Sequence, residues 1–229
     1  MTTDLTAVHP AAPGSAAGVA AVRGIGAHVR AVTPTAAQAQ ADFRALLNVL
    51  ARPGVLDAVG RSGGPPALAV AAGLADVEVP TAVLTAPGEE HWAEALHLAT
   101  SAPPAAQDTA RMVVALRPPT AAEIAGLTRG DVMHPEHGTR LVAAVTAVER
   151  AGQPVPGAEG PGVVLALSGP GVPGTRRIRV TGLPRAVFEA LAEANADFPA
   201  GVDVFLVAQD GTVAGLPRST RIEIENGDV

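Results

Sequence analysis

An alternation of strand and helix patterns is the feature that most constrains the fold of this chain. Between residues 55 and 148 short runs rich in Val, Ala and Thr are separated by segments with helical pattern. The strand patterns cover 55–59, 81–85, 111–116 and 139–148, and the helix patterns cover 67–75, 89–99 and 118–127. Strands joined by helices pair in parallel and are covered by helices. The alternation therefore predicts an α/β sandwich with a largely buried sheet.

The pattern changes in the second half of the chain. A Pro/Gly-rich connector, GQPVPGAEGPG at 152–162, is predicted to be a long loop rather than a domain boundary. After it come strand patterns and one helix pattern, at 163–167, 176–181 and 184–194, and then a C-terminal meander. In the meander Gln209-Asp210-Gly211 has the chemistry of a hairpin turn. We expect a three-layer αβα sandwich whose mixed sheet is parallel early and antiparallel late.

The expected domain organisation is simple. Residues 1–30 are mainly Ala, Gly, Pro and Val with no sustained period, which indicates a mobile N-terminal extension. Residues 31–229 are expected to form a single domain. With 48% hydrophobic but only 2% aromatic residues, its core must be built from small aliphatic side chains. No apolar run reaches the length of a membrane helix and the N-terminus lacks a basic signal region, so we expect a cytoplasmic protein.

The segment 35–54 is predicted to be an amphipathic helix that ends at Pro53-Gly54. Its large apolar residues follow helical spacing and are expected to face the core: Phe43, Leu46, Leu47 and Leu50. A polar row lies beside them: Arg44, Asn48 and Arg52. The pattern alone favours an ordinary surface helix closed by a tight turn.

Two residue types are missing, and their absence excludes several chemistries. The chain has no cysteine, which excludes disulfides, thiolate nucleophiles and iron–sulfur ligation within it. It also has no lysine, so all 16 basic residues are arginine, which excludes a Walker lysine and a Schiff-base lysine for pyridoxal phosphate. Arginine still suits bidentate binding of phosphate or phosphonate oxygens. The net charge of -6 argues against a nucleic-acid-binding protein.

Two short motifs resemble ligand sites. Gly169, Gly171 and Gly174 match the dinucleotide fingerprint as a string, yet a strand pattern follows where a helix should begin, so we expect a tight turn between strands. His134 and His137 flank Glu136 in an HPEH cluster. That spacing can ligate a metal, but Pro135 prevents the helix that would align both imidazoles, so no metal site is expected. Glu136 is the better candidate for a role.

A third motif, Leu216-Pro217-Arg218-Ser219-Thr220-Arg221, follows the last hairpin. Arg218 with the hydroxyls of Ser219 and Thr220 can hold a phosphate group. The competing interpretation is a structural salt bridge that ties the last strand to the helix at 35–54. Both remain open, because strand-end loops are where functional residues tend to lie.

Five blocks of the sequence resemble a known family. They are AQADFRALLNVLARPGV at 39–55, LADVEVP at 74–80, PEHGT at 135–139, LSGPGV at 167–172 and FPAGVDVFLVAQDGTVAGLPRSTRIE at 198–223. In order and content these blocks are similar to the H subunit of the carbon–phosphorus lyase system, which degrades organophosphonates in bacteria. The connector at 152–162 and the N-terminal extension depart from the family pattern.

The resemblance implies a fold similar to that of pyridoxal-phosphate-dependent transferases, without the cofactor or its lysine. It implies G, I and J partner subunits, and a homodimer when the chain is isolated. In that complex a phosphonate displaces adenine from a nucleoside triphosphate, giving ribose 1-phosphonate 5-triphosphate, whose carbon–phosphorus bond the J subunit later cleaves by radical chemistry. The chain would then be a subunit of a transferase/lyase system rather than a stand-alone enzyme.

The resemblance leads to one hypothesis and two competitors. The hypothesis is that Arg44, Arg52 and Arg218, from blocks at opposite ends of the chain, meet in space and bind an anionic group or a partner's acids. The remaining candidates are Glu136, Ser219 and Thr220, and no catalytic residue is identified. The first competitor is a structural scaffold in which the same arginines hold the fold. The second is a stand-alone transferase active without partners.

Overall fold

The computed structural model describes residues 16–61, 63–153 and 161–225, with side chains from residue 24 onward. The helices are α1 (Ala16–Val32), α2 (Ala36–Ala51), α3 (Pro66–Ala72), α4 (His91–Thr100), α5 (Ala121–Ala125), α6 (Arg185–Ala194) and the 3-10 helix η1 (Pro135–His137). The strands are β1 (Leu56–Ala58), β2 (Thr81–Leu84), β3 (Met112–Ala115), β4 (Arg140–Val145), β5 (Ala147–Arg150), β6 (Gly162–Gly169), β7 (Val172–Thr181), β8 (Asp203–Ala208), β9 (Thr212–Leu216) and β10 (Arg221–Glu225). Each element predicted between residues 55 and 127 is present within a few residues of its expected bounds.

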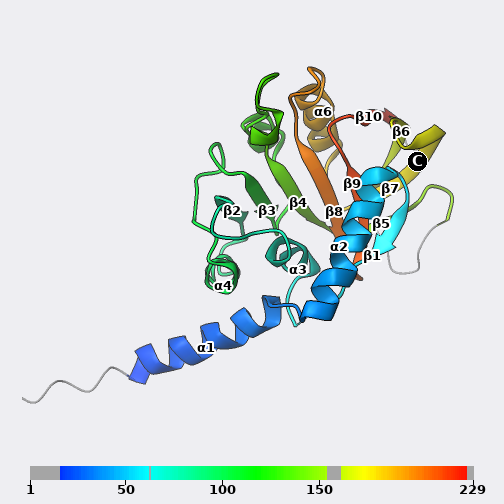
Figure 1. Cartoon of the computed structure of the whole chain (residues 1–229). Helices are drawn as coiled ribbons and strands as arrows, with labels where there is room; N and C mark the ends of the chain where they lie inside the picture. The colour runs from blue at the N-terminus through cyan, green and yellow to red at the C-terminus, as the bar shows by residue number, and fades with distance from the viewer. Residues whose placement is uncertain (1–15, 62, 154–160, 226–229) are drawn as a thin grey trace, which may run out of the picture.

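A six-stranded mixed sheet forms the centre of the molecule (Figure 1). Its strand order is β1-β9-β8-β4-β3-β2, with β2, β3, β4 and β8 parallel and β8, β9 and β1 antiparallel. The β8–β9 hairpin turns at Gln209-Asp210-Gly211, where Gly211 has a φ of 90°. The α/β class, the mixed sheet and the predicted hairpin are therefore confirmed.

A second, four-stranded antiparallel sheet was not expected. Its order is β10-β6-β7-β5. The run at 139–148, predicted as one strand, is divided between the two sheets at Thr146, whose N–H donates to the carbonyl of Thr181 in β7 at 2.9 Å. The chain thus leaves the six-stranded sheet as β4 and enters the other as β5. The run TRLVAAVTAV contains no Gly or Pro, so its pattern gives no signal for this crossover.

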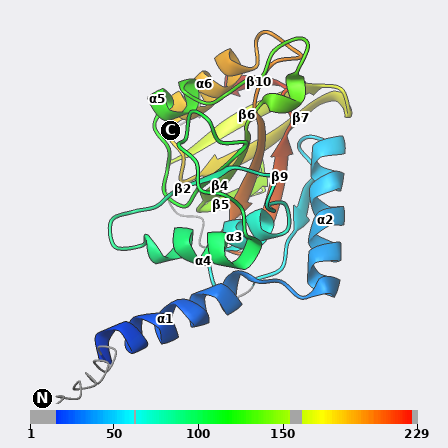
Figure 2. The same cartoon turned by 60° about the vertical axis from the view of Figure 1, so that its left-hand side comes forward.

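Helices and the second sheet cover the six-stranded sheet (Figure 2), and apolar side chains fill the core on each face. On one face the side chains of α1 to α4 pack around Met112, Val142 and Phe205. On the other face α5, α6 and the four-stranded sheet share a core that includes Phe188, Leu165 and Ile178. The expected layer of helices alone is therefore wrong for this second face, because a sheet occupies part of it.

Helix α1 packs along α4 at one end of the molecule (Figure 2). The rings of His28 and Trp92 meet edge-on with centroids 4.8 Å apart, and Val32 is fully buried. The sequence pattern did not predict this helix, because its Gly and Ala residues show no clear stripe. Residues 1–15 of the predicted extension, and 154–160 of the predicted connector, lie outside the described residues. Across the described parts of the chain, no helix has the length and apolar character needed to cross a membrane.

Helix α2 buries a different face from the one predicted. Leu46 is buried, but Phe43 and Leu47 are 49% and 52% exposed. The buried positions are Asp42, Ala45, Leu46 and Val49. The reason lies in β9, where a Cβ on Gly215 would stand 2.7 Å from the carbonyl carbon of Val49. The backbone of the helix therefore lies directly against the strand, which buries the face with Ala45, Leu46 and Val49 and leaves Phe43 and Leu47 at the surface.

Candidate functional site

Arg218 is held by protein groups on several sides. Its Nη2 and Nε donate to the carboxylate of Asp203 at 2.6 and 3.2 Å, and its backbone N–H donates to the same carboxylate at 2.9 Å. Its Nη1 donates to the carbonyls of Pro135 and Pro199 at 2.5 and 3.4 Å. The side chain is only 14% exposed. A structural salt bridge is therefore the interpretation that the geometry supports, with Asp203 of β8 as the partner instead of a group on α2.

Ser219 and Thr220 line a cavity of about 450 Å³ beside Arg218. Thr220 is 3% exposed, its backbone N–H closes a turn onto Pro217 at 2.8 Å, and its hydroxyl has no hydrogen-bond partner among the described residues. Arg221 also lines this cavity and is exposed. The guanidinium that faces solvent here is thus that of Arg221, a residue that the motif analysis did not select.

The polar row of α2 divides into a bound part and a free part. Arg52 donates to the side-chain oxygen of Asn48, and Asn48 donates to Asp57 of β1 at 2.6 Å. These bonds fasten the end of α2 to the edge of the sheet. Arg44 is exposed and forms no side-chain hydrogen bond or ion pair with any described residue. Of the row, Arg44 is the member available to an outside partner.

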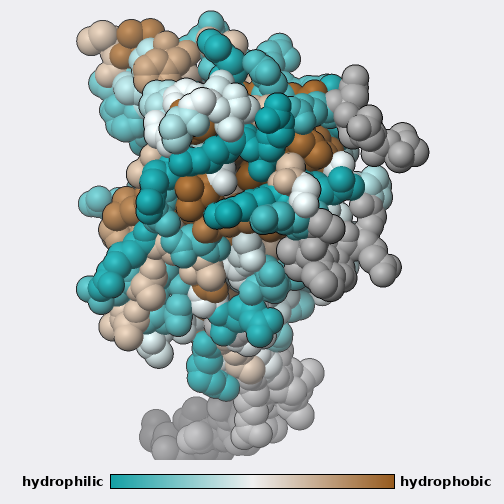
Figure 3. Space-filling model, turned by 90° about the vertical axis from the view of Figure 1, so that its right-hand side faces the viewer, coloured by the Kyte–Doolittle hydropathy of each residue, from teal (hydrophilic) through white to brown (hydrophobic). Residues whose placement is uncertain are grey.

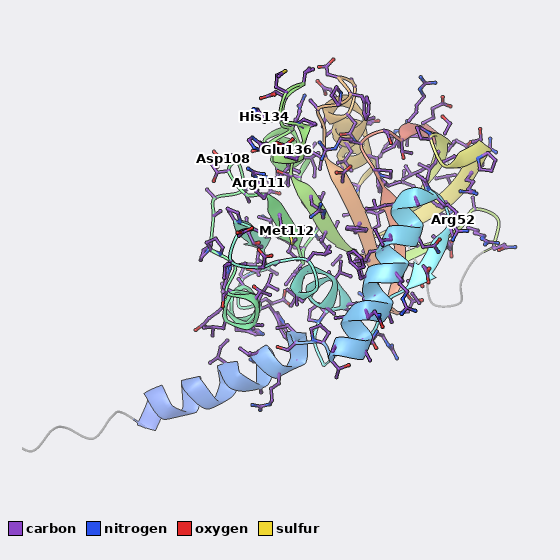
Figure 4. The ribbon with its side chains drawn as sticks, in the orientation of Figure 1. Arg52, Asp108, Arg111, Met112, His134 and Glu136 are labelled. Carbon is purple, nitrogen blue, oxygen red and sulfur yellow. The ribbon has the colours of Figure 1, made fainter. Side chains whose placement is uncertain are left out.

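The arginine candidates are not gathered into one site. The β6–β7 turn lies between them. Gly171 of this turn packs against Ala51 at the end of α2, and a Cβ added to Gly169 would stand 3.0 Å from the carbonyl oxygen of Ser219. Figure 4 shows Arg52 well apart from Glu136, which neighbours the Pro135 carbonyl that Arg218 binds. Gly169 has a φ of 119° and Gly171 a φ of 78°, so the predicted tight turn between the strands is confirmed.

The HPEH cluster does bring its three side chains together. Glu136 Oε1 lies 3.2 Å from His134 Nδ1 and 3.6 Å from His137 Nε2. The two imidazole rings stack with centroids 4.9 Å apart and an interplanar angle of 12°. The argument that Pro135 keeps the imidazoles apart is wrong, because the proline starts a 3-10 turn, in which residues i and i+3 lie on the same side.

The cluster lies at the amino end of the parallel strands, beside Arg111 (Figure 4). Hydrogen bonding to the backbone N–H of Glu136, and then the neighbouring histidines, hold the pKa of that carboxyl below its usual value. The pKa of Asp131 is lowered by bonds from the N–H groups of His134 and Met133. Two carboxylates are therefore ionised beside two histidines at neutral pH.

A second cavity, of about 350 Å³, opens at the carboxyl ends of β3, β4 and β8. The strand-end residues that line it include Leu116, Val145, Thr146, Ala208 and Gln209, and Glu89 faces it from the loop before α4. Ligands of open α/β sheets bind at this edge. No predicted site residue lies there, because its lining carries few side chains with recognisable chemistry. The sequence signal that could have located this cavity was the set of positions directly after each predicted strand.

Comparison with known proteins adds an independent observation. The model of the family described as bacterial phosphonate metabolism protein (PhnH) matches residues 31–223. The subunit PhnH of alpha-D-ribose 1-methylphosphonate 5-triphosphate synthase from Rhizobium meliloti is 29% identical over 197 residues, which cover 82% of this chain and 92% of that protein. A putative C-P lyase subunit protein, HtxG, from Stutzerimonas stutzeri is 33% identical over 96 residues, which cover 42% of this chain and 43% of that protein.

Proposed function

The chain belongs to the PhnH family of bacterial phosphonate metabolism proteins, and from that membership we propose that it is a subunit of a carbon–phosphorus lyase assembly. In this role it supports formation of ribose 1-phosphonate 5-triphosphate from a nucleoside triphosphate and a phosphonate. The name of the Rhizobium relative, a ribose 1-methylphosphonate 5-triphosphate synthase subunit, supports the proposal. The partners are the G, I and J subunits, and the isolated chain is a homodimer. The cytoplasmic location, a fold like that of pyridoxal-phosphate-dependent transferases, and action without a cofactor belong to the same proposal.

The outer face of α2 carries the proposal. Phe43 and Leu47 are about half exposed one turn apart, and the unpaired Arg44 lies beside them. Figure 3 views the side of the molecule on which α2 lies, and shows hydrophobic residues reaching the surface among hydrophilic ones. Aromatic residues and arginine are enriched in protein interfaces, and the exposed leucine beside them enlarges the apolar surface. We assign this face to a partner subunit whose acids meet Arg44.

Co-purification tests the assignment. The chain is co-expressed with the G, I and J subunits, and a tag on the I subunit is used for capture. We expect Leu47→Ser and Phe43→Ser to reduce the retained chain at least about tenfold, since interface anchors typically contribute 2 kcal/mol or more. Leu98→Ser is the matched control, because Leu98 is 58% exposed on α4 and should leave retention unchanged.

The result separates three cases. Loss of retention with an unchanged melting temperature supports the α2 interface. Full retention of both variants contradicts it. If the isolated variants become monomers yet still join the assembly, the face belongs to the homodimer instead. Turnover of a nucleoside triphosphate and a phosphonate by the purified chain alone would support the stand-alone transferase.

The alternative function is a structural scaffold of the same assembly with no ligand site of its own. The observation that favours it concerns Arg218. Its guanidinium is already hydrogen-bonded to Asp203 and to two backbone carbonyls, so it is not available to bind a phosphate at the predicted site. Growth on methylphosphonate as sole phosphorus source distinguishes the two. A scaffold tolerates Arg221→Ala, whereas a subunit that binds a phosphate group in the cavity beside Ser219 and Thr220 loses growth with this variant.

A further inference from the structure

We propose that His134, Glu136 and His137 form a binding site for a divalent transition-metal ion of the Zn²⁺ class. The proposal does not depend on the assembly described above. Among the described residues this is the group in which one carboxylate and two imidazoles converge, with one ligand atom of each lying within 4.8 Å of the others.

The spacing of the ligand atoms fits a metal. Zn²⁺ binds imidazole nitrogen and carboxylate oxygen at about 2.0–2.2 Å, so two ligands in tetrahedral geometry stand roughly 3.3–3.5 Å apart. Glu136 Oε1 lies 3.2 Å from His134 Nδ1 and 3.6 Å from His137 Nε2. Both distances lie within about 0.1 Å of that range. The third pair, between the two imidazoles, lies within 4.8 Å, and the stacked rings must turn out of their 12° parallel arrangement for their nitrogens to converge on one ion.

The backbone of the loop is fastened before any ion binds. Arg218 donates to the carbonyl of Pro135 at 2.5 Å, and Arg111 donates to the carbonyl of Glu136 at 3.3 Å. The carboxylate of Asp131 accepts the N–H groups of Met133 and His134, both at 2.8 Å. Because the backbone is already fixed, ordering the ligand side chains around an ion costs less conformational entropy.

The charges around the loop favour a cation. Glu136 and Asp131 supply two carboxylates, while the positive charge of Arg218 is paired with Asp203 at 2.6 Å. Arg111 approaches the loop and contacts the backbone carbonyl of Glu136 instead of the ligand side chains. Two imidazoles with one carboxylate select borderline metals, because Mg²⁺ and Ca²⁺ prefer oxygen ligands.

The site is open to solvent. The side chains of His134, Glu136 and His137 are 57%, 63% and 46% exposed. Three protein ligands leave at least one coordination position free, as in catalytic rather than structural zinc sites. Water or an anionic oxygen, such as that of a phosphate or phosphonate group, is the class of ligand that this position accepts.

Calorimetric titration of the untagged full chain with zinc chloride tests the proposal. We expect one ion per chain, and a loss of affinity of at least tenfold in the double variant His134→Ala/His137→Ala. Glu136→Gln keeps the shape of the side chain and should also bind more weakly. The matched control is His97→Gln, because His97 lies on α4 with its ring bonded to the carbonyl of Ala102, and this variant should bind like the wild type.

Two further readouts make the result independent of calorimetry. At a free zinc concentration about one hundred times the Kd, the melting temperature should rise by roughly 5 to 10 °C in the wild type and not in the double variant. Cobalt(II) bound at the site should give a visible absorption spectrum that Glu136→Gln alters. Absence of binding to the wild type, or equal binding by the wild type and either ligand variant, would overturn the proposal.

Discussion

Single residues in this protein acquire their roles from partners far away in the sequence. Arg218 resembles a phosphate-binding arginine in its Pro-Arg-Ser-Thr context, yet Asp203 and Pro135, which are 15 and 83 positions away, take its donors. Because the guanidinium is nearly buried, its removal would take the charge-assisted donors from Asp203 and Pro135, leaving the carboxylate with only the backbone N–H of residue 218 and the carbonyl with only that of Gly138. The scaffold interpretation therefore fits Arg218, and the partner-binding interpretation fits Arg44.

Replacing these two arginines should separate the interpretations. We expect Arg218→Ala to lower the free energy of unfolding by about 2–4 kcal/mol, because it breaks a mostly buried, charge-assisted network. Arg44→Ala should change it by no more than about 0.5 kcal/mol, as is usual for an exposed side chain without a partner. Urea denaturation of both variants measures the difference. Equal stability of the two would show that Arg218 is not the structural member of the pair.

At the level of elements, the β6–β7 turn packs against both the end of α2 and the turn before β10. Gly171 lies against the last turn of α2, and Gly169 lies against the turn that precedes β10. Arg176 of β7 donates to the carbonyl of Pro53 at 3.0 Å, directly after the helix. The LSGPGV block thus has a structural explanation that does not involve a nucleotide.

Two glycines of this hairpin provide a matched comparison. Both have positive φ, 78° at Gly171 and 71° at Gly174, so alanine at either should cost about 1–2 kcal/mol in backbone strain. A Cβ at Gly171 would also overlap the carbonyl oxygen of Ala51, whereas nothing lies within 4 Å of one at Gly174. We expect Gly171→Ala to destabilise the chain by at least about 1–3 kcal/mol more than Gly174→Ala. Thermal denaturation measures the gap, and its absence would mean that α2 does not rest on this turn.

On the scale of the whole molecule, the two sheets share one core. Phe188 of α6 is fully buried in the cluster that contains Ile178 and Val180 of the four-stranded sheet and Leu141 and Leu206 of the six-stranded sheet. The single tryptophan, Trp92, packs against the cluster on the opposite face of the central sheet. If residues 31–229 form a single domain, a substitution that destabilises the core on one face of the central sheet should also destabilise the other face.

Phe188→Ala tests that coupling. Loss of this side chain should cost about 3–5 kcal/mol and lower the melting temperature by roughly 6 to 20 °C. Trp92 fluorescence and far-ultraviolet circular dichroism should report the same lowered midpoint, because one cooperative unit unfolds at once. Leu98→Ala, at a residue that is 58% exposed, serves as the control with little expected change. Separate midpoints for the two probes would divide the chain into two folding units.

Local pattern and motif order determined much of this protein from the sequence alone. The alternation of strands and helices, the mixed character of the main sheet, the hairpin at Gln209-Asp210-Gly211 and the turn at Gly169 to Gly171 depend on neighbouring residues, so they can be read directly. The family membership was also readable, because its blocks retain their order along residues 31–223.

Tertiary structure alone decided the features that depend on distant contacts. Close packing at Gly215 chose which face of α2 is buried and left Phe43 and Leu47 at the surface. The crossover at Thr146 created a second sheet, and the 3-10 turn after Pro135 brought two histidines together. Burial and convergence are set by whichever part of the chain packs against a segment, and periodicity within the segment carries no information about that partner.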